Sequence, residues 1–423
     1  MSSRASGVDS ESIDRLGAEL SAAGLEGMLV LAPSSRDGDL APFVGDVQLG
    51  ECFVIATAAG RVALGFLTDM EREEAAATGM DLLSPARLRL AELKGLERVP
   101  GRHWSGVLAR AFAELEIAPG AWGVAGHPPA GTAVEACSAL AADGWRFAAG
   151  GEILRRWRRF KPAAWRERMA APAAGVCAAM RRVAALLAAA APRAGELELD
   201  GEPLRVGRLR EAARVELARH GLWEPEGDIF AAGSAAGVPH SRGDSSHVLR
   251  PGEPLVVDLF PRGWLFADCT RTFCVGEPSP EFRRAHASVL GALRAAHEGC
   301  RPGVAGWALQ ERACAALEAL GYPTARSTPD TRRGYVHGLG HGVGFELHEY
   351  PSFREAAGDE GVLAVGDLVT LEPGLYDPDA GWGVRLEDLC YLGAGGLVNL
   401  TPLPYAWDPA AWAAAVAPAS AAG

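Results

Sequence analysis

Residues 256–276, VVDLFPRGWLFADCTRTFCVG, decide the interpretation of the second half of this chain. Two apolar stretches flank Pro-Arg-Gly, a pattern typical of two antiparallel strands joined by a short turn. Each stretch carries one aspartate, Asp258 and Asp268, although acids are depleted in strands and rarely buried unless paired. With the turn centred on Gly263, Asp258 is predicted to lie directly opposite Asp268, with Cβ atoms about 5 Å apart. Two such carboxylates repel each other, so either one holds a proton or a cation lies between them.

Taken alone, the hairpin leaves open a second interpretation, in which one aspartate faces solvent at a frayed strand end. The segment YVHGLGHGVGFELHEYP (335–351) favours the first, because it holds His337, His341 and His348 among glycines. A histidine-bearing surface loop would explain that segment by itself. Imidazole combined with carboxylates suits Mn, Co, Fe or Zn rather than a metal selected by thiolates.

Two glutamates complete the pattern. Glu372 lies in the strand-like run GDLVTLEPGLY, and Glu387 lies in WGVRLEDLCYL, two residues after Arg385. Alternation puts Arg385 and Glu387 on one face of a strand; for either glutamate alone, an edge strand remains the alternative. Four carboxylates can hold two dications while nearly neutralising them, and a metal pair about 3.5–4 Å apart can activate a water. The sequence therefore predicts a site for two divalent metal ions, manganese before cobalt, iron or zinc.

These segments resemble the pita-bread metallopeptidases, a family that includes aminopeptidase P, prolidase, methionine aminopeptidase and the metal-free creatinase. DLFPRGWLFADCTRTFCVG resembles the family's D-x-T-R-T block, and HGLGHGVGFELHE its H-G-x-G-H-x-x-G-x-x-x-H-E block. TLEPGLY resembles x-x-E-P-G-x-Y, and GVRLED resembles G-x-R-x-E-D. The ordered set spans about 165–405. The N-terminal part matches in size and position alone, which favours the creatinase and aminopeptidase P branch.

The resemblance implies a set of five metal ligands: Asp258, Asp268, His341, Glu372 and Glu387. Asp268 and Glu387 would bridge the metals, Asp258 would bind the second metal alone, and His341 and Glu372 would bind the first alone. Glu372 would also serve as general base for a metal-bridging hydroxide. The spacing of the two aspartates is one residue shorter than the family pattern, and the loss falls at the Pro-Arg-Gly tip.

The resemblance also implies roles on the substrate side of the site. His348 would hydrogen-bond the scissile carbonyl or the tetrahedral intermediate, a role whose removal typically costs about 10²–10³ in rate. His240, in GVPHSRGD, falls where the family has a cleft histidine near the leaving group. His337 matches a substrate-side histidine of the proline-specific members, and Arg385 a residue that supports the ligands.

The length of 423 residues suggests two domains. Residues 1–155 alternate helical and strand patterns without a chemical motif, which predicts a small α/β domain. Residues 156–423 group strands around two helical segments, 279–298 and 305–320, which predicts an α+β domain. The resemblance implies that the first is a creatinase-like domain and the second a catalytic domain with the pita-bread fold. The charged stretch 153–169 is interpreted as the connection and as a solvated face.

Composition excludes several classes of partner. A formal net charge of −12 argues against nucleic acid, since phosphate binding needs a basic face. The eight cysteines contain no Cys-x-x-Cys pair, which indicates reduced thiols and a cytoplasmic protein. The polar N-terminus lacks the apolar core of a signal peptide, and no apolar run is expected to cross a bilayer. Pro172 predicts a kink or break in an Ala-rich helix.

The expected activity is hydrolysis of Xaa-Pro bonds, of aminopeptidase P or prolidase type, in peptides with a free N-terminus. The resemblance also implies a homodimer. Two alternatives stay open: a hydrolase or lyase with the same fold and metals acting on a small non-peptide substrate, and a catalytically silent module that binds peptides.

Overall fold

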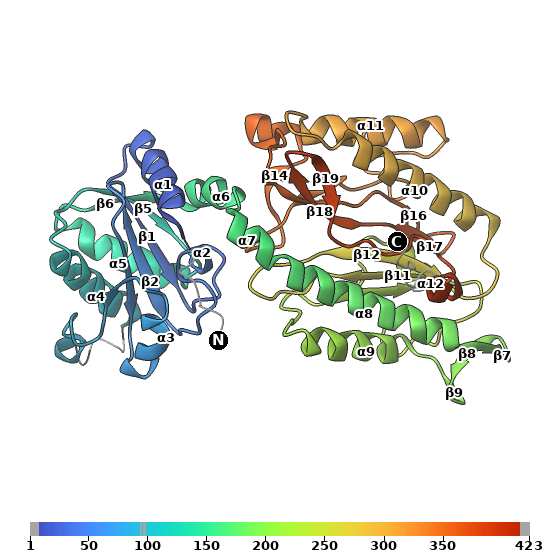
Figure 1. Ribbon diagram of the computed structural model, residues 1–423, viewed down its shortest axis with the longest axis horizontal. Helices are drawn as coiled ribbons and strands as arrows, with labels where there is room; N and C mark the ends of the chain where they lie inside the picture. The colour runs from blue at the N-terminus through green and yellow to red at the C-terminus, as the bar shows by residue number, and fades with distance from the viewer. Residues whose placement is uncertain (1–7, 94, 96–98, 415–423) are drawn as a thin grey trace, which may run out of the picture. The chain divides into compact units, whose positions relative to one another are not determined.

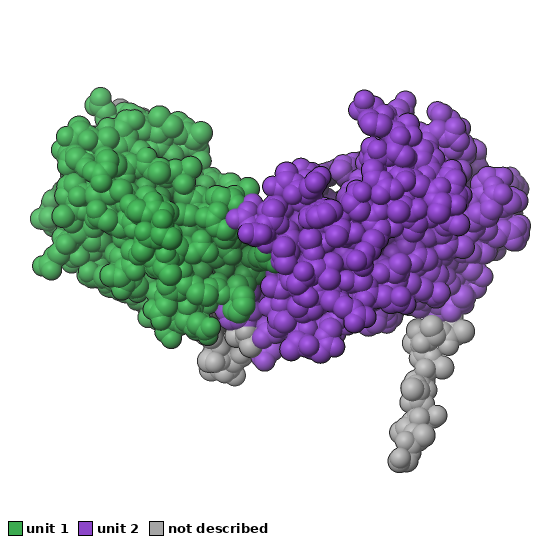
Figure 2. Space-filling view, turned by 90° about the horizontal axis from the view of Figure 1, so that it is seen from above, with its two compact units in different colours: residues 1–160 green, residues 161–423 purple. Residues whose placement is uncertain are grey.

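The computed structural model describes residues 8–93, 95 and 99–414. The chain forms two compact units, residues 1–160 and 161–423, which are coloured separately in Figure 2. Helix α6 (Gly151–Arg159) belongs to the first unit, so the boundary expected after residue 155 falls inside that helix.

The first unit is built on a six-stranded sheet with the order β4-β3-β2-β1-β5-β6 (Figure 1). The β1–β2 and β2–β3 pairs are antiparallel, whereas β1–β5, β5–β6 and β3–β4 are parallel. The strands are β1 (Gly27–Ala32), β2 (Cys52–Thr57), β3 (Val62–Phe66), β4 (Asp81–Leu83), β5 (Ala121–Ala125) and β6 (Arg146–Ala149). The helices besides α6 are α1 (Ser10–Ala22), α2 (Ala41–Val44), α3 (Arg72–Ala76), α4 (Pro100–Glu114) and α5 (Ala130–Ala141).

Local sequence explains the start of this unit. Helix α1 begins after Asp9, whose side chain accepts a hydrogen bond from the backbone N–H of Ser12 at 2.8 Å. Leu16 and Leu20 lie on its buried face. The β2–β3 hairpin turns at Gly60, whose φ of +86° favours glycine. The α/β character predicted for this part of the chain is confirmed.

The second unit carries the predicted site on two sheets, with orders β10-β11-β12 and β14-β13-β15-β18-β19, beside the β16–β17 pair. These strands are β10 (Asp228–Ala232), β11 (Pro254–Leu259), β12 (Cys269–Cys274), β13 (His341–Gly342), β14 (Glu349–Ser352), β15 (Leu368–Leu371), β16 (Gly374–Asp377), β17 (Trp382–Arg385), β18 (Asp388–Gly393) and β19 (Gly396–Asn399). A small sheet of β7 (Ala191–Arg193), β8 (Glu196–Leu199) and β9 (Glu202–Pro203) lies apart from them.

Helices cover these sheets from two sides (Figure 1). Helices α8 (Ala170–Ala189) and α9 (Val206–Arg219) run beside β10, β11 and β12. Helices α10 (Pro280–Gly299) and α11 (Gly306–Ala319) lie on the other side and confirm the two predicted helical segments. The short helices α7 (Ala163–Arg168) and α12 (Ala410–Ala414) complete the unit.

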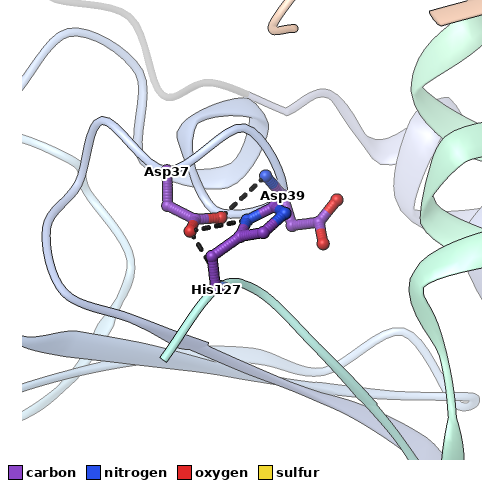
Figure 3. Close-up of side chains that lie close together, drawn as sticks. All are labelled: Asp37, Asp39 and His127. Carbon is purple, nitrogen blue, oxygen red and sulfur yellow. Dashed lines mark hydrogen bonds and ion pairs between the residues drawn. The ribbon is translucent and has the colours of Figure 1, made fainter. Parts of the chain in front are cut away.

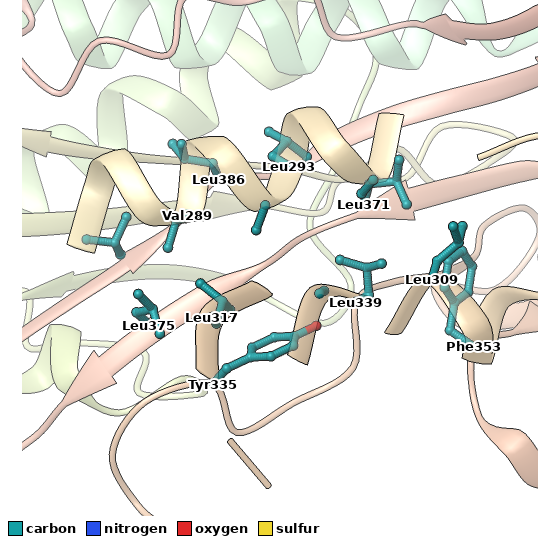
Figure 4. Close-up of a cluster of buried hydrophobic side chains, with 14 of the residues drawn as sticks. Val289, Leu293, Leu309, Leu317, Tyr335, Leu339, Phe353, Leu371, Leu375 and Leu386 are labelled. Atoms are coloured by element: carbon teal, nitrogen blue, oxygen red, sulfur yellow. The ribbon is translucent and has the colours of Figure 1, made fainter. Parts of the chain in front are cut away.

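The core under α10 and α11 orients the two glutamates of the site (Figure 4). Leu371 and Leu386, each 0% exposed, pack into this core together with Val289 and Leu293 of α10. Burial of each such side chain contributes about 1.5–3 kcal/mol. Because neighbouring side chains on a strand point to opposite faces, the residues that follow these leucines face away from the core.

The hairpin of residues 256–276 forms, but its predicted register is wrong. Asp258 pairs with Thr270 rather than with Asp268. The turn is centred on Trp264, one residue later than predicted, and this moves the cross-strand pairing by two residues. With a side-chain period of two, a two-residue shift leaves both aspartates on one face. Asp268 is therefore a diagonal neighbour of Asp258.

Tertiary contacts of the hairpin tip account for this register. The backbone N–H of Phe266 donates to the carbonyl of Gly344 at 2.8 Å, and Arg262 exchanges backbone hydrogen bonds with Trp223. Neither partner belongs to the hairpin. The alternation of apolar residues fixes the face of each side chain, but it does not fix which residue occupies the turn centre.

The Ala-rich helix is interrupted as Pro172 predicts. Helix α7 ends at Arg168 and α8 begins at Ala170, so Pro172 lies in the first turn of α8, where its missing N–H costs no hydrogen bond.

One expectation about membranes needs correction. The helical stretch Trp165–Ala189 is long and apolar enough, by length and composition, to cross a bilayer. Over half of its apolar window, 56%, is buried inside the molecule. A core helix of a folded domain passes the same test, so the stretch is weak evidence for a membrane span.

The basic stretch 153–169 is not the solvated face that was predicted. Arg158 is 0% exposed, and its Nη1 lies 2.5 Å from Asp39 Oδ1 within the first unit. Lys161 is 1% exposed, and its Nζ lies 2.7 Å from Glu349 Oε2 within the second unit. The acidic partners lie more than a hundred residues away in the sequence, so the local charge run does not reveal them.

Candidate metal centre and active site

The five predicted ligands converge from separate strands of the second unit. Asp258 lies in β11, Asp268 directly precedes β12, His341 opens β13, Glu372 follows β15, and Glu387 joins β17 to β18. Side chains at strand ends are held by the sheet yet border a space that a ligand can enter.

The strand register brings the two glutamates together. Leu371 pairs with Asp388 on one side, and Gly374 pairs with Arg385 on the other. Both pairs belong to the same antiparallel register, so Glu372 lies opposite Glu387. The backbone N–H of Glu387 donates to the carbonyl of Thr270 at 3.0 Å, which joins this pair to β12.

His341 lies among three of the carboxylates. Its Nε2 is 3.7 Å from Asp268 Oδ2 and 3.6 Å from Glu372 Oε1. Ligand atoms of Asp268, His341 and Glu387 all lie within 4.8 Å of one another. One divalent ion could contact all three groups after small side-chain movements.

The residues fit divalent metal ions. Asp258, Asp268 and Glu387 are 8%, 5% and 2% exposed, respectively. The Oδ1 atoms of Asp258 and Asp268 are buried and have no hydrogen-bond partner among the described residues. Buried carboxylate oxygens without partners are costly, and a hard cation would satisfy them. The donor set of four carboxylates and one imidazole has the composition that such ions prefer.

Without a metal, the carboxyl groups resist ionisation. Burial raises the pKa of Asp268 well above its usual range, and the charges of Glu387, Asp258 and Glu372 raise it further. Burial and the charge of Glu372 likewise raise the pKa of Glu387. Burial raises the pKa of Glu372 to about 8, although Arg385 opposes the shift. The metal-free site therefore favours the protonated form of these acids, whereas a bound cation would favour the ionised form.

The histidines are held neutral, as metal ligands must be. Burial, followed by the charge of His348, lowers the pKa of His341 to about 3. His341 Nδ1 lies 3.0 Å from the carbonyl of Gly342, so this nitrogen carries the proton and Nε2 presents its lone pair to the carboxylates. Burial, followed by the charge of Arg385, also lowers the pKa of His337 to about 3.

Arg385 supports the ligands and is itself buried. Its Nη2 lies 2.6 Å from Asp258 Oδ2, its Nε donates to Thr270 Oγ1 at 3.2 Å, and its Nη1 donates to the hydroxyl of Tyr376 at 2.8 Å. Arg385 is 3% exposed, so its guanidinium donates to these groups rather than to solvent. It orients Asp258 and offsets part of the negative charge.

The other predicted residues border the same site. His337 Nδ1 is 3.9 Å from Glu372 Oε2, and the ring of His348 lies 4.2 Å from that of His341, centre to centre. His240 is exposed and close enough to influence the pKa of both His337 and His348. The structure thus brings every sequence-predicted site residue into one region.

Two further residues of the site were not predicted. Thr270 Oγ1 donates to Glu387 Oε2 at 2.8 Å. The hydroxyl of Tyr376 accepts from Arg385 and lies 2.8 Å from His337 Nε2. Thr270 carries a signal in the sequence, because it lies two residues after Asp268 and period-two alternation puts it on the same face. Tyr376 carries no such signal, because no proposed ligand lies in β16.

A second group of acids and histidine lies in the first unit, where no chemical motif was found in the sequence. Asp37, Asp39 and His127 form it (Figure 3). Asp37 Oδ2 lies 2.9 Å from His127 Nδ1, and Asp39 Oδ1 is paired with Arg158. The fragment RDGDL around both aspartates could have suggested an acidic loop, but nothing in it pointed to His127.

A family comparison matches most of the second unit. Residues 168–394 match the model of metallopeptidase family M24. The chain is 36% identical over 197 residues to an Xaa-Pro dipeptidase of Pyrococcus furiosus, covering 45% of this chain and 52% of that protein. It is 33% identical over 174 residues to an Xaa-Pro dipeptidase of Lactobacillus delbrueckii subsp. lactis, covering 41% and 44%. The matches thus span about half the length of these curated relatives.

Solved structures extend the similarity of fold over nearly the whole chain. The prolidase of Pyrococcus horikoshii OT3 superposes with a TM-score of 0.71 at 20% identity, covering 92% of this chain and 98% of that one. An X-Pro aminopeptidase of Thermotoga maritima MSB8 gives 0.70 at 19% identity, covering 93% and 98%. These likenesses confirm the predicted fold. Together with the family match over more than half of the sequence, they lead to one conclusion: this chain belongs to metallopeptidase family M24.

Proposed function

We propose that the chain is a two-metal peptidase that hydrolyses Xaa-Pro bonds in short peptides with a free amino terminus. One observation carries the proposal: five side chains with metal-ligand chemistry converge, and two buried carboxylate oxygens among them have no partner in the described part of the chain. The names of the Xaa-Pro dipeptidase relatives support the substrate class.

The residues divide into metal ligands and substrate-side groups. The ligands would be Asp258, Asp268, His341, Glu372 and Glu387. Divalent metals bound there would supply Lewis acidity and lower the pKa of water.

Glu372 is proposed to carry the proton. Its Oε1 lies 3.6 Å from His341 Nε2, so its carboxylate borders the space in which a metal-held water would lie. It would take a proton from the attacking water and deliver it to the leaving nitrogen. An amide nitrogen leaves as an amine only once it is protonated, and in an Xaa-Pro bond this is the ring nitrogen of proline.

The histidines are proposed to orient the peptide. Burial lowers the pKa of His348, so its ring is neutral at pH 7 and can donate one N–H to the oxygen that gains charge during the reaction. His240 and His337 would contact the substrate on either side of the scissile bond, and the hydroxyl of Tyr376 would orient His337.

A peptide panel assayed with Mn, Co, Fe and Zn tests the proposal. We expect hydrolysis of Xaa-Pro or Xaa-Pro-Yaa peptides and none of Met-Ala-Yaa, with activity lost on chelation and restored by metal. A dipeptidase should cleave Ala-Pro and spare Ala-Pro-Pro, whereas an aminopeptidase should prefer the longer peptide. Inactivity of metal-loaded protein on every Xaa-Pro peptide would favour a non-peptide substrate. Binding of less than about one equivalent of metal would favour the silent module.

Manganese as the native metal, a homodimer and a cytoplasmic location complete the proposal. The carboxylate-rich donor set favours manganese. Metal analysis of protein purified without added metal, and light scattering during gel filtration, test the first two.

A further inference from the structure

A buried ion pair lies on the opposite side of the backbone from the carboxylate of Glu387. Thr270 and Glu387 face the site, where Thr270 Oγ1 donates to Glu387 Oε2 at 2.8 Å. Their chain neighbours, Arg271 and Asp388, point to the opposite face because side chains alternate along a strand. There Arg271 Nη2 lies 2.7 Å from Asp388 Oδ1. Side-chain contacts thus join the segment at Thr270 to the segment at Glu387 on both faces.

Arg271 also hydrogen-bonds the backbone of the residues that face the site. Its Nη1 donates to the carbonyl of Glu387 at 2.5 Å and to that of Thr270 at 2.9 Å, while its Nε donates to the carbonyl of Pro404 at 3.0 Å. The side chain is 1% exposed. A guanidinium is planar and its donors form a rigid fork, so these bonds fix the two carbonyls relative to each other.

Asp388 is anchored in turn by aromatic groups. The hydroxyl of Tyr405 donates to Asp388 Oδ2 at 2.6 Å, and His297 Nε2 lies 3.2 Å from the same oxygen. The guanidinium of Arg271 lies over the ring of Tyr405, 4.8 Å from its centre. Both carboxylate oxygens of Asp388 therefore have partners within the cluster.

We propose that the Arg271 cluster (Arg271, Asp388 and Tyr405) is a positioning device that sets the carboxylate of Glu387 for metal binding. The inference rests on the proposed function. None of the three side chains reaches the metal site; they act through the backbone of Glu387 and through Thr270. Loss of a residue that orients a metal ligand typically costs about 10–100-fold in metal affinity.

Calorimetric titration of the chelator-treated full chain with Mn²⁺ tests this role. Asp388→Asn keeps the shape of the side chain and removes its charge, and we expect it to raise the Mn²⁺ dissociation constant about 10–100-fold. Tyr405→Phe removes one hydrogen bond and should raise it about 2–10-fold. At limiting Mn²⁺ both variants should lose kcat with little change in KM, and excess Mn²⁺ should restore kcat. The visible absorption of bound Co²⁺ should also change.

Asp39→Asn is the matched control, because it breaks the buried Arg158–Asp39 pair in the other unit. It should lower the melting temperature and leave Mn²⁺ affinity unchanged. Wild-type Mn²⁺ affinity in a folded Asp388→Asn protein would overturn the inference. If that variant does not fold, unchanged affinity in Tyr405→Phe would do the same. Failure of the wild-type chain to bind Mn²⁺ would overturn the proposed function and the inference together, so the two failures are distinguishable.

Discussion

Each unit of the molecule gathers aspartates and histidine into one cluster, and the two clusters differ in how their carboxylate oxygens are satisfied. In the first unit Asp37 Oδ1 accepts from the N–H of Asp39, and Asp37 Oδ2 accepts from His127. Asp39 Oδ1 pairs with Arg158, and Asp39 Oδ2 accepts from the N–H of Gly126. All four oxygens have protein partners.

The cluster of the second unit contains His341 and four carboxyl groups, three of which lie near its ring. Arg385 pairs with Asp258 Oδ2, but Oδ1 of Asp258 and Oδ1 of Asp268 are buried without a partner in the described part of the chain. The comparison teaches that proximity of acids and histidine does not by itself indicate a metal site. The clusters differ in how many carboxylate oxygens have no partner among the described residues, and this difference favours the second cluster as the metal site.

The largest expected difference between the clusters is in activity. Glu372→Gln removes a proposed ligand that is also the proposed base, so kcat should fall by about 10²–10⁴ at saturating Mn²⁺. Asp37→Asn, an equivalent change in the first unit, should leave kcat within about twofold of the wild-type value, because no reacting group lies there. Steady-state assays on an Xaa-Pro peptide check both. An equal loss in the two variants would remove the functional distinction.

The next effect is on stability. Asp39→Asn removes a carboxylate that pairs with the buried guanidinium of Arg158, and breaking a buried pair costs about 3–5 kcal/mol. In metal-free protein, Glu387→Gln should instead be neutral or stabilising, because it relieves crowding among buried acids. Urea unfolding in the presence of a chelator measures both. If both changes destabilised the protein to the same extent, the proposed difference between the two clusters would be contradicted.

The pH dependence of the stability of the metal-free protein also distinguishes the two clusters. Glu372 has a pKa of about 8 in the folded chain against an ordinary value of 4.5, so between these values the folded state holds more protons. Stability therefore falls as pH rises from about 4.5 to about 8. The raised pKa values of Asp268 and Glu387 act in the same direction. Denaturant unfolding across this range checks the sign, and saturating Mn²⁺ should remove the fall.

The smallest expected effect on stability comes from an exposed ion pair, which serves as a reference for the buried pair. Arg72 and Asp69 form an exposed pair with side chains 54% and 55% exposed. Arg72→Ala should change the free energy of unfolding by less than about 1 kcal/mol, because solvent screens such pairs. A change as large as that of Asp39→Asn would show that burial is not what separates the two kinds of pair.

Much of this could be predicted from the sequence. The hairpin of residues 256–276, helices α10 and α11 and the break before Pro172 follow from period, turn and proline rules, which are local. The register of the hairpin could not be predicted, because the carbonyl of Gly344 and the backbone of Trp223 hold its tip. The burial of Arg158 and Lys161 was missed for the same reason: their acidic partners are distant in sequence.

The sequence by itself determined which residues could serve as ligands, since their types, order and strand alternation are written in the chain. Only the tertiary structure decided that they meet, that Arg385 pairs with Asp258 while two carboxylate oxygens have no partner among the described residues, and that Arg271 pairs with Asp388 on the opposite face. The physical reason is that alternation and turn propensity act over a few residues. The burial that raises the pKa of an acid, and the partner that stabilises a buried charge, depend on segments brought together by folding.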